Sequence, residues 1–304
     1  MKRLKRTVLS FAVLASLLGA IMMGIGYVKG GIAQTNQLQT AGLTKVEQTV
    51  EAFDQIAIES TDSAYTPGYT IVLRPSSTTE SSVSYFTSDK RPVTATVKNG
   101  VLTLTTAMPS DSKEVRFYFP SVTNVWGHIT NKRMADADTI VIEVAKGTDL
   151  KKLAANLTTG SLEISDMKIA ELGLSAAVGS VELINVTVDK GLVDVDTGDF
   201  EAEGSQLNSL SLTSSVGSVD LIKTTVSESD MTLDMGSLDG EGVTFLGHNT
   251  IATSMGDVDL ILADKNLTVL TSVDLGDSDI STGLIKSDKN QLEITTDTGS
   301  ITVE

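Results

Sequence analysis

The sequence predicts an all-β fold, built mainly as a parallel β-solenoid and preceded by an irregular β region and one N-terminal transmembrane helix. Three observations lead to this prediction: glycines that recur at nearly equal intervals, apolar residues that alternate around each glycine, and an uncharged run near the N-terminus. A chain of 304 residues has room for about two folded domains, so an anchor followed by one or two folded units is the natural division.

A five-residue phrase, Gly-(Ser/Asp)-apolar-(Glu/Asp)-apolar, recurs through the C-terminal half. Its glycines are separated by 19, 19, 19, 19, 20, 20 and 23 residues: Gly160, Gly179, Gly198, Gly217, Gly236, Gly256, Gly276 and Gly299. Such regular spacing is typical of architectures in which each repeat stacks on its neighbours. We therefore expect about eight coils of 19–20 residues over residues 149–304, stacked in the order of the sequence.

Apolar and polar residues alternate on both sides of each glycine. The second and fourth residues after it are mostly apolar, as in Leu162 and Ile164, and so are the fifth, third and first residues before it, as in Met231, Leu233 and Met235. A period of two predicts a strand with one buried face, so each coil should hold two short strands. The glycine falls at a corner that needs a positive φ or leaves no room for a Cβ atom. Helical repeats and propeller blades need longer units.

Residues 51–148 are expected to form an irregular β region that caps the first coil. Strand-like segments separated by turns lie at residues 69–73, 83–86, 93–97, 101–104, 115–119 and 140–144. A cap would prevent the open end of the solenoid from pairing with other chains.

Residues 29–50 are polar and are expected to form a stalk. Within it, Thr44 and Glu47 have the spacing of a capping box, which predicts a short helix covering Val46, Val50 and Phe53.

The N-terminus has the features of a membrane anchor. Residues 1–6 include four basic residues, and residues 7–28 contain no charge. As a helix this run is about 33 Å long, enough to cross a hydrocarbon core of about 30 Å. The basic tail should stay in the cytoplasm, which places everything after Val28 outside the cell. The alternative is a cleaved signal peptide, because Gly31-Ile32-Ala33 fits the small-x-small pattern of a cleavage site.

A row of small residues with a spacing of four runs along the expected anchor: Ala12, Ser16, Ala20 and Gly24. Such a row lets membrane helices pack closely, so a helix-mediated dimer is one hypothesis, although small residues are also common in anchors.

Charge and composition limit the possible partners. Without the four N-terminal bases, 19 of the 23 basic residues remain against 39 acids, so the exterior part carries a formal charge of 19 − 39 = −20. Such a charge repels nucleic acid and favours cations or basic partners. The chain has no cysteine, which excludes disulfides and thiolate metal sites.

The third residue after seven of the glycines is acidic, and stacking should place these residues in one column on the outer face: Glu163, Glu182, Glu201, Asp220, Asp239, Asp259 and Asp279. This acidic column is a candidate interaction surface for a basic ligand or for a wall polymer that bears amino groups. Calcium is a weaker hypothesis, with Asp257, Asp259, Asp277 and Asp279 as the best candidate ligands. The alternative is a solvated polar face with diffuse counterions. No cofactor is expected.

An enzyme of the carbohydrate-active class on a β-helix scaffold is an alternative that the sequence disfavours. No arginine follows Arg133, and the two histidines, His128 and His248, have turn-like surroundings without a paired acid or nucleophile. Both are expected to be loop residues.

Several short motifs resemble the bacterial domain of unknown function labelled putative adhesin, of the LiaG-like kind found in the envelopes of Firmicutes. They are Phe53-x-x-Ile56-x-Ile58, Asn99-Gly100-x-Leu102-x-Leu104, Phe117-x-Phe119-Pro120 and the reiterated phrase Thr159-Gly160-Ser161-Leu162-Glu163-Ile164. The resemblance covers roughly residues 50–304. It implies a surface β-solenoid, with no catalytic residues to carry over.

The sequence thus predicts a non-catalytic, single-pass surface protein, a putative adhesin or interaction scaffold whose partner is an unidentified envelope protein or cell-wall polymer. A regulatory role in sensing envelope stress is the alternative within the binding class.

Overall fold

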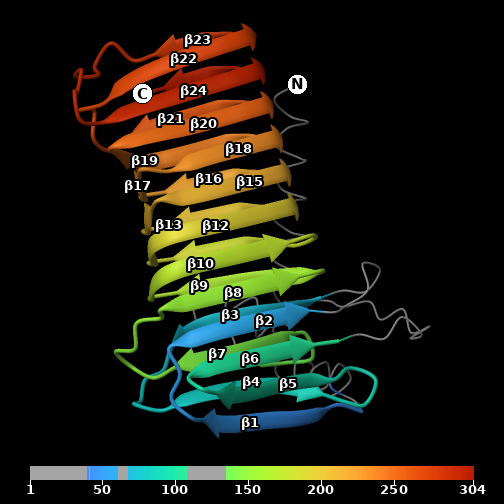
Figure 1. Cartoon of the computed structure of the whole chain (residues 1–304). Helices are drawn as coiled ribbons and strands as arrows, with labels where there is room; N and C mark the ends of the chain where they lie inside the picture. Colours follow the sequence, from blue (N-terminus) through green and yellow to red (C-terminus); the bar gives the residue numbers. More distant parts are fainter. Residues whose placement is uncertain (1–39, 41, 61–67, 108–134) are drawn as a thin grey trace, which may run out of the picture.

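The computed structural model describes residues 40, 42–60, 68–107 and 135–304. Within these ranges every regular secondary-structure element is a β-strand. The strands stack along one axis, and most coils contribute one strand to each of two sheets, here named sheet A and sheet B (Figure 1). The described part of the chain is therefore an all-β solenoid, and most of its strand pairs are parallel.

Sheet A contains β1 (Thr44–Val50), β3 (Tyr69–Pro75), β4 (Ser81–Thr87), β7 (Thr139–Val144), β9 (Gly160–Ser165), β11 (Val181–Ile184), β13 (Phe200–Glu203), β16 (Val219–Ile222), β21 (Val258–Leu262), β23 (Ser278–Ile280) and β25 (Ile301–Val303). Sheet B contains β2 (Gln55–Ser60), β5 (Val93–Lys98), β6 (Val101–Thr106), β8 (Lys152–Leu157), β10 (Lys168–Ala176), β12 (Thr187–Thr197), β14 (Gln206–Asn208), β15 (Leu210–Val216), β17 (Thr225–Ser227), β18 (Asp230–Met235), β20 (His248–Met255), β22 (Thr268–Leu275) and β24 (Gln291–Thr298). The long β19 (Leu238–Leu246) runs through both sheets.

The core lies between the two sheets and contains mainly aliphatic side chains. Leu162, Ile164, Met231 and Leu233 are each no more than 1% exposed, as the alternation predicted. At seven of the eight glycines the preceding residue does not follow the pattern, because the backbone turns there at the end of the strand. Met235, for example, is 47% exposed.

The repeat glycines form a column at the corner between a sheet B strand and the following sheet A strand. Their φ angles lie between +125° and +155°. A Cβ atom on Gly198 would lie 2.0 Å from the carbonyl oxygen of Gly179 on the neighbouring coil. Both predicted requirements, a positive φ and a close backbone approach, are confirmed.

The last two coils are stacked in an order that the sequence did not predict. The pair β24–β25 lies between β20–β21 and β22–β23, so the C-terminal strands fill a gap left by the preceding coil (Figure 1). The prediction that the coils follow the order of the sequence is therefore wrong at this end. The ten residues between β23 and β24 form the connection that lets the chain return.

A similar insertion occurs at the other end. β2 pairs in parallel with both β6 and β8, and β3 pairs in parallel with both β7 and β9. The region expected to be an irregular cap therefore contributes to the parallel stack. The strands predicted at residues 69–73, 83–86, 93–97, 101–104 and 140–144 are confirmed, and the one at 115–119 lies outside the described residues.

The cap is made of antiparallel strands. β5 pairs with β6, β4 pairs with β7, and β1 pairs with β4 at the edge of sheet A. β1 occupies the segment expected to form a short helix, so that prediction is wrong. The alternating residues of Thr44–Val50 find hydrogen-bonding partners on β4, and this tertiary pairing overrides the local capping signal.

The predicted anchor, residues 7–28, and the small-residue row within it lie outside the described residues. In the parts of the chain that the structure does describe, no helix has the length and apolar character to cross a membrane.

Candidate functional site

The acidic column runs along the outward face of sheet A. Glu163 pairs in register with Glu182, and the in-register pairing continues through Glu201, Asp220 and Asp239 to Asp259. Neighbouring strands are about 4.8 Å apart, so these six carboxylates form one line. The predicted stacking is confirmed for this part of the column.

The seventh member does not adjoin the others. Thr302 of β25 pairs with Asp259 on one side and with Asp279 on the other, because β24–β25 is inserted between the two coils. The same insertion places Ser300 between Asp257 and Asp277, and the Asp257 carboxylate accepts a hydrogen bond of 2.7 Å from the Ser300 backbone N–H.

The four aspartates proposed as calcium ligands are therefore split between two coils that are separated by the inserted coil β24–β25. We expected them to be neighbours, and this was wrong. Among the described residues no group of three or more acidic or histidine side chains is close enough to hold a metal ion.

Glu163 is not solvent-exposed, contrary to prediction. Its side chain is 3% exposed, and the outward-facing Val72 and Val141 of the neighbouring coils are 1% and 3% exposed. The outward face of sheet A is thus buried at this end of the solenoid. The sequence held a signal of this: Thr139–Val144 is a nearly continuous apolar run, which is typical of strands buried on both faces.

The C-terminal half of the continuous column lines a shallow groove of about 420 Å³ that is bordered by five carboxyl side chains: Asp220, Asp239, Glu241, Asp259 and Glu304. Burial raises the pKa of Asp220, and the carboxylates of Asp239 and Asp199 raise it further. Burial also raises the pKa of Asp239, with further contributions from Asp259 and Asp257. The stacked carboxylates therefore repel one another.

Neutralising one of these groups should stabilise the fold at neutral pH. The folded pKa of Asp220 lies above its ordinary value of 3.8, so the ionised carboxylate costs stability at pH 7. That cost falls as the pH drops through the raised pKa and is gone below the ordinary one. We expect Asp220→Asn and Asp239→Asn each to raise the free energy of unfolding by about 0.5–1 kcal/mol at pH 7 and to leave it unchanged at pH 3. Thermal unfolding at the two pH values measures this difference.

The control is Asp288→Asn, which removes an exposed carboxylate in the connection between β23 and β24. A gain at Asp220 or Asp239 that is equally large at pH 3 would show that the side chain, and not its charge, is responsible.

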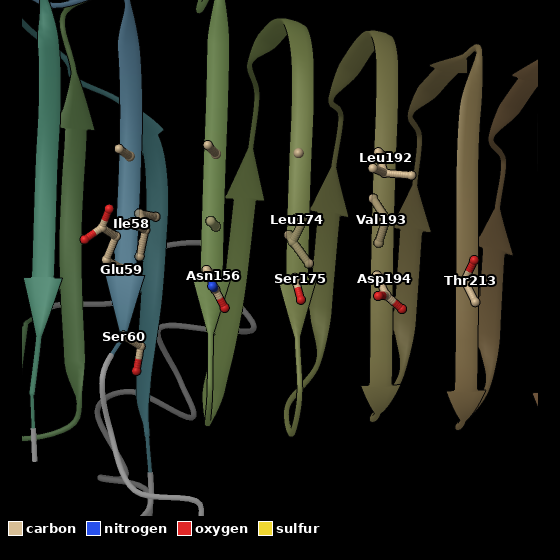
Figure 2. Close-up of a pocket in the computed structure, with 14 residues that line it drawn as sticks. Ile58, Glu59, Ser60, Asn156, Leu174, Ser175, Leu192, Val193, Asp194 and Thr213 are labelled. Carbon is tan, nitrogen blue, oxygen red and sulfur yellow. The ribbon is translucent and has the colours of Figure 1, made fainter.

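A second surface feature lies on the outward face of sheet B. Ala57, Ala154 and Gly173 are paired in register on three adjacent strands, and their small side chains leave a shallow hollow of about 620 Å³. Leu192, 63% exposed, occupies the same register position on the next strand and borders the hollow (Figure 2).

A polar row lies beside the small residues of this hollow. Glu59, Asn156, Ser175, Asp194 and Thr213 occupy the next outward register position on successive strands, as Figure 2 shows. Sequence reasoning missed the hollow, although small residues at one register position of three coils would have indicated it. It has an apolar floor with a hydrophilic border, but no described side chain encloses it.

His248 is the exposed first residue of β20 and pairs with Gln291, so it lies in sheet B, away from the acidic column. The prediction that His248 is a loop residue is wrong, because it already belongs to a strand. The loop ends one residue earlier, at the bend formed by Gly247. His128 lies outside the described residues.

Comparison with known proteins gives a family match and several distant structural matches. The model of the family described as Toastrack DUF4097 matches residues 54–304. No curated protein sequence matches the chain.

Three of the similar solved structures have low sequence identity to this chain. A putative cell adhesion protein from Clostridium sporogenes is 10% identical, with a TM-score of 0.26, and the match covers 86% of this chain and 98% of that one. A putative adhesin from Bacteroides fragilis is 14% identical, with a TM-score of 0.37 and coverage of 87% and 98%. A putative lipid binding protein from Parabacteroides distasonis is 15% identical, with a TM-score of 0.37 and coverage of 87% and 97%.

Proposed function

This chain belongs to the toastrack family DUF4097, and on that premise we propose that it is a non-catalytic surface protein and interaction scaffold of a bacterial cell envelope. In this proposal residues 7–28 hold the chain in the membrane, residues 1–6 lie in the cytoplasm, and the solenoid stands outside the cell. Its partner is an envelope protein or a cell-wall polymer, and the adhesive role printed in the names of two similar structures fits such a scaffold.

The observation that carries the proposal is the continuous carboxylate column from Glu182 to Asp259. Its members are held in register by strand pairing, so their spacing is fixed before any partner arrives. A rigid row of like charges attracts a partner that carries positive charges along its length. This arrangement suits repeated contacts with an extended ligand better than chemistry at one point.

The placement of His248 supports a non-catalytic role. Hydrolysis of glycans uses carboxyl groups that converge on one bond from two sides. Here the acidic column spreads along one open face of sheet A, and His248 belongs to the other sheet. The two sets of groups do not converge on a common point.

A single cysteine experiment tests location and scaffold role together. The natural chain has no cysteine, so each introduced thiol is the only one. Ser218→Cys places a thiol beside the acidic column, Ser211→Cys places one on the outward face of sheet B, and Lys2→Cys places one in the N-terminal tail. Intact cells would be treated with a membrane-impermeant maleimide that carries a photo-crosslinker.

We expect both serine variants to be labelled in intact cells and Lys2→Cys only after permeabilisation. Irradiation should give a crosslinked product with the Ser218→Cys variant that Ser211→Cys does not give. Absence of labelling at Ser218 and Ser211 in intact cells would overturn the proposed location. Labelling without any crosslink, together with release of sugars from isolated cell walls by the purified chain, would favour the enzyme instead.

A further inference from the structure

A ridge of exposed, mostly apolar side chains follows the corner of the solenoid just before the glycine column. We name it the corner ridge. In the order of the stack it consists of Val178, Thr197, Val216, Met235, Met255, Thr298 and Leu275. All seven side chains are exposed, with values of 40% for Val216, 52% for Met255 and 68% for Leu275.

The ridge is continuous from Thr197 to Leu275 because strand pairing holds these members in register. Val216 pairs with Met235, Met235 with Met255, and Met255 with Thr298. Single exposed apolar residues are normal on a protein surface, but a contiguous strip of them marks an interaction site. Methionine side chains are flexible and polarisable, and they adapt well to a partner surface.

Carboxylates flank the corner ridge on both sides. The residue before each ridge position is acidic in four coils, and the residue two positions after it is acidic in three. They are Asp196, Asp234, Asp274 and Asp297 on the first side and Asp199, Asp257 and Asp277 on the second, all of them exposed. Within the described part of the chain, no lysine or arginine forms a salt bridge with any of these seven carboxylates. The ridge is therefore an apolar strip between two rows of negative charge that the described chain does not balance.

We propose that the corner ridge is a docking site for a basic amphipathic α-helix of a partner protein. This inference rests on the proposed scaffold function and names the kind of partner that this edge of the scaffold binds. The apolar face of the helix lies on Val216, Met235 and Met255, and lysine or arginine side chains on its flanks reach the two rows of aspartates.

The geometry favours a helix over an extended strand. Successive members of the ridge are about 4.8 Å apart, and the turns of an α-helix follow each other every 5.4 Å. Three steps along the ridge span about 14 Å and three helical turns about 16 Å, so the two stay nearly in step. Same-face residues of an extended strand lie about 6.8 Å apart and lose register after two contacts.

The charge excludes other occupants of the same strip. A second copy of this chain would bring two sets of aspartates together, and an anionic lipid surface would repel them. Nucleic acid would be repelled for the same reason. An apolar partner without positive charge would leave the aspartates without counter-charges.

The test uses the full chain in nanodiscs of phosphatidylcholine, with empty nanodiscs as the background. The probe is a dye-labelled 18-residue helix of leucine and lysine with one apolar face, and binding is followed by fluorescence anisotropy. A peptide of the same composition with a scrambled order, which has no apolar face, is the control probe. We expect saturable binding of the amphipathic probe and at least a tenfold weaker response to the scrambled one.

Two double variants separate the apolar and charged contributions. Met235→Ser with Met255→Ser should weaken binding at least tenfold. Asp234→Asn with Asp257→Asn should weaken it and reduce its dependence on salt, while the asparagine at 257 keeps an oxygen that accepts the Ser300 N–H bond. The matched control, Leu192→Ser with Ile261→Ser, removes side chains that are 63% and 53% exposed on the sheet faces, away from the ridge.

Unchanged affinity in the methionine variant, or equal loss in the Leu192 and Ile261 control, would overturn the proposal. Equal binding of the scrambled probe would also overturn it. Each of these results leaves the labelling pattern of the cysteine variants unaffected, so failure of the ridge is distinguishable from failure of the scaffold function.

Discussion

Replacing Gly217 with alanine is expected to lower the free energy of unfolding by about 3 kcal/mol or more. The φ angle of Gly217 is +146°, a conformation that residues with a Cβ atom rarely adopt. The added Cβ would also lie 1.9 Å from the carbonyl oxygen of Gly198, which belongs to the backbone of the next coil and cannot move alone. Because each coil is held by its neighbours, a distortion here weakens two interfaces of the stack.

Gly173→Ala is the matched control for this experiment. A Cβ at Gly173 meets nothing within 4 Å, and its φ is not in the positive region. We expect its stability to change by less than about 1 kcal/mol, with a gain as the direction, because alanine reduces the freedom of the unfolded chain. Urea and thermal unfolding of the two variants check this prediction, and equal stabilities would show that the glycine column is not a structural requirement.

The second large effect is expected in the core. Leu212 on β15 is 1% exposed, and Leu212→Ala should cost about 2–5 kcal/mol through lost burial and the cavity left behind. Leu192 on the neighbouring β12 is 63% exposed, so the same substitution there should change stability by less than about 0.5 kcal/mol.

Both leucine variants can be compared by denaturant unfolding under identical conditions. A loss at Leu192 as large as that at Leu212 would mean that the outward face of sheet B is covered in solution. In that case the hollow beside Leu192 would not be an open surface.

Local patterns were enough to predict the two strands that flank each glycine, but not the short third strands β14 and β17 of the middle coils. The alternation around Gly198 and Gly217 indicates which side chains face the core, since a strand has only two faces. The spacing of the glycines records the corners, because only glycine tolerates both the dihedral angle and the close carbonyl. The alternation depends on residues near one another in the sequence, and the close carbonyl lies only one repeat away.

The candidate site was predicted only in part. The column from Glu182 to Asp259 follows from the repeat, whereas the burial of Glu163 depends on packing against its outward face at one end of the stack. The corner ridge was misread, because the alternation places Met235 and Met255 toward the core until the turn of the backbone directs them outward. No periodicity marks the residue at which a strand leaves its sheet.

By itself, the sequence determined that this chain is an all-β repeat protein, where its glycine corners lie, and which residues within the flanking strands face its core. Only the tertiary structure decided the order of the coils at both ends, and with it the position of Thr302 between Asp259 and Asp279. The physical reason is that parallel strands of similar length and pattern can pair with one another in several orders. The order depends on how the connecting segments return the chain to an open edge of the stack. The periodic pattern of the sequence does not specify this return.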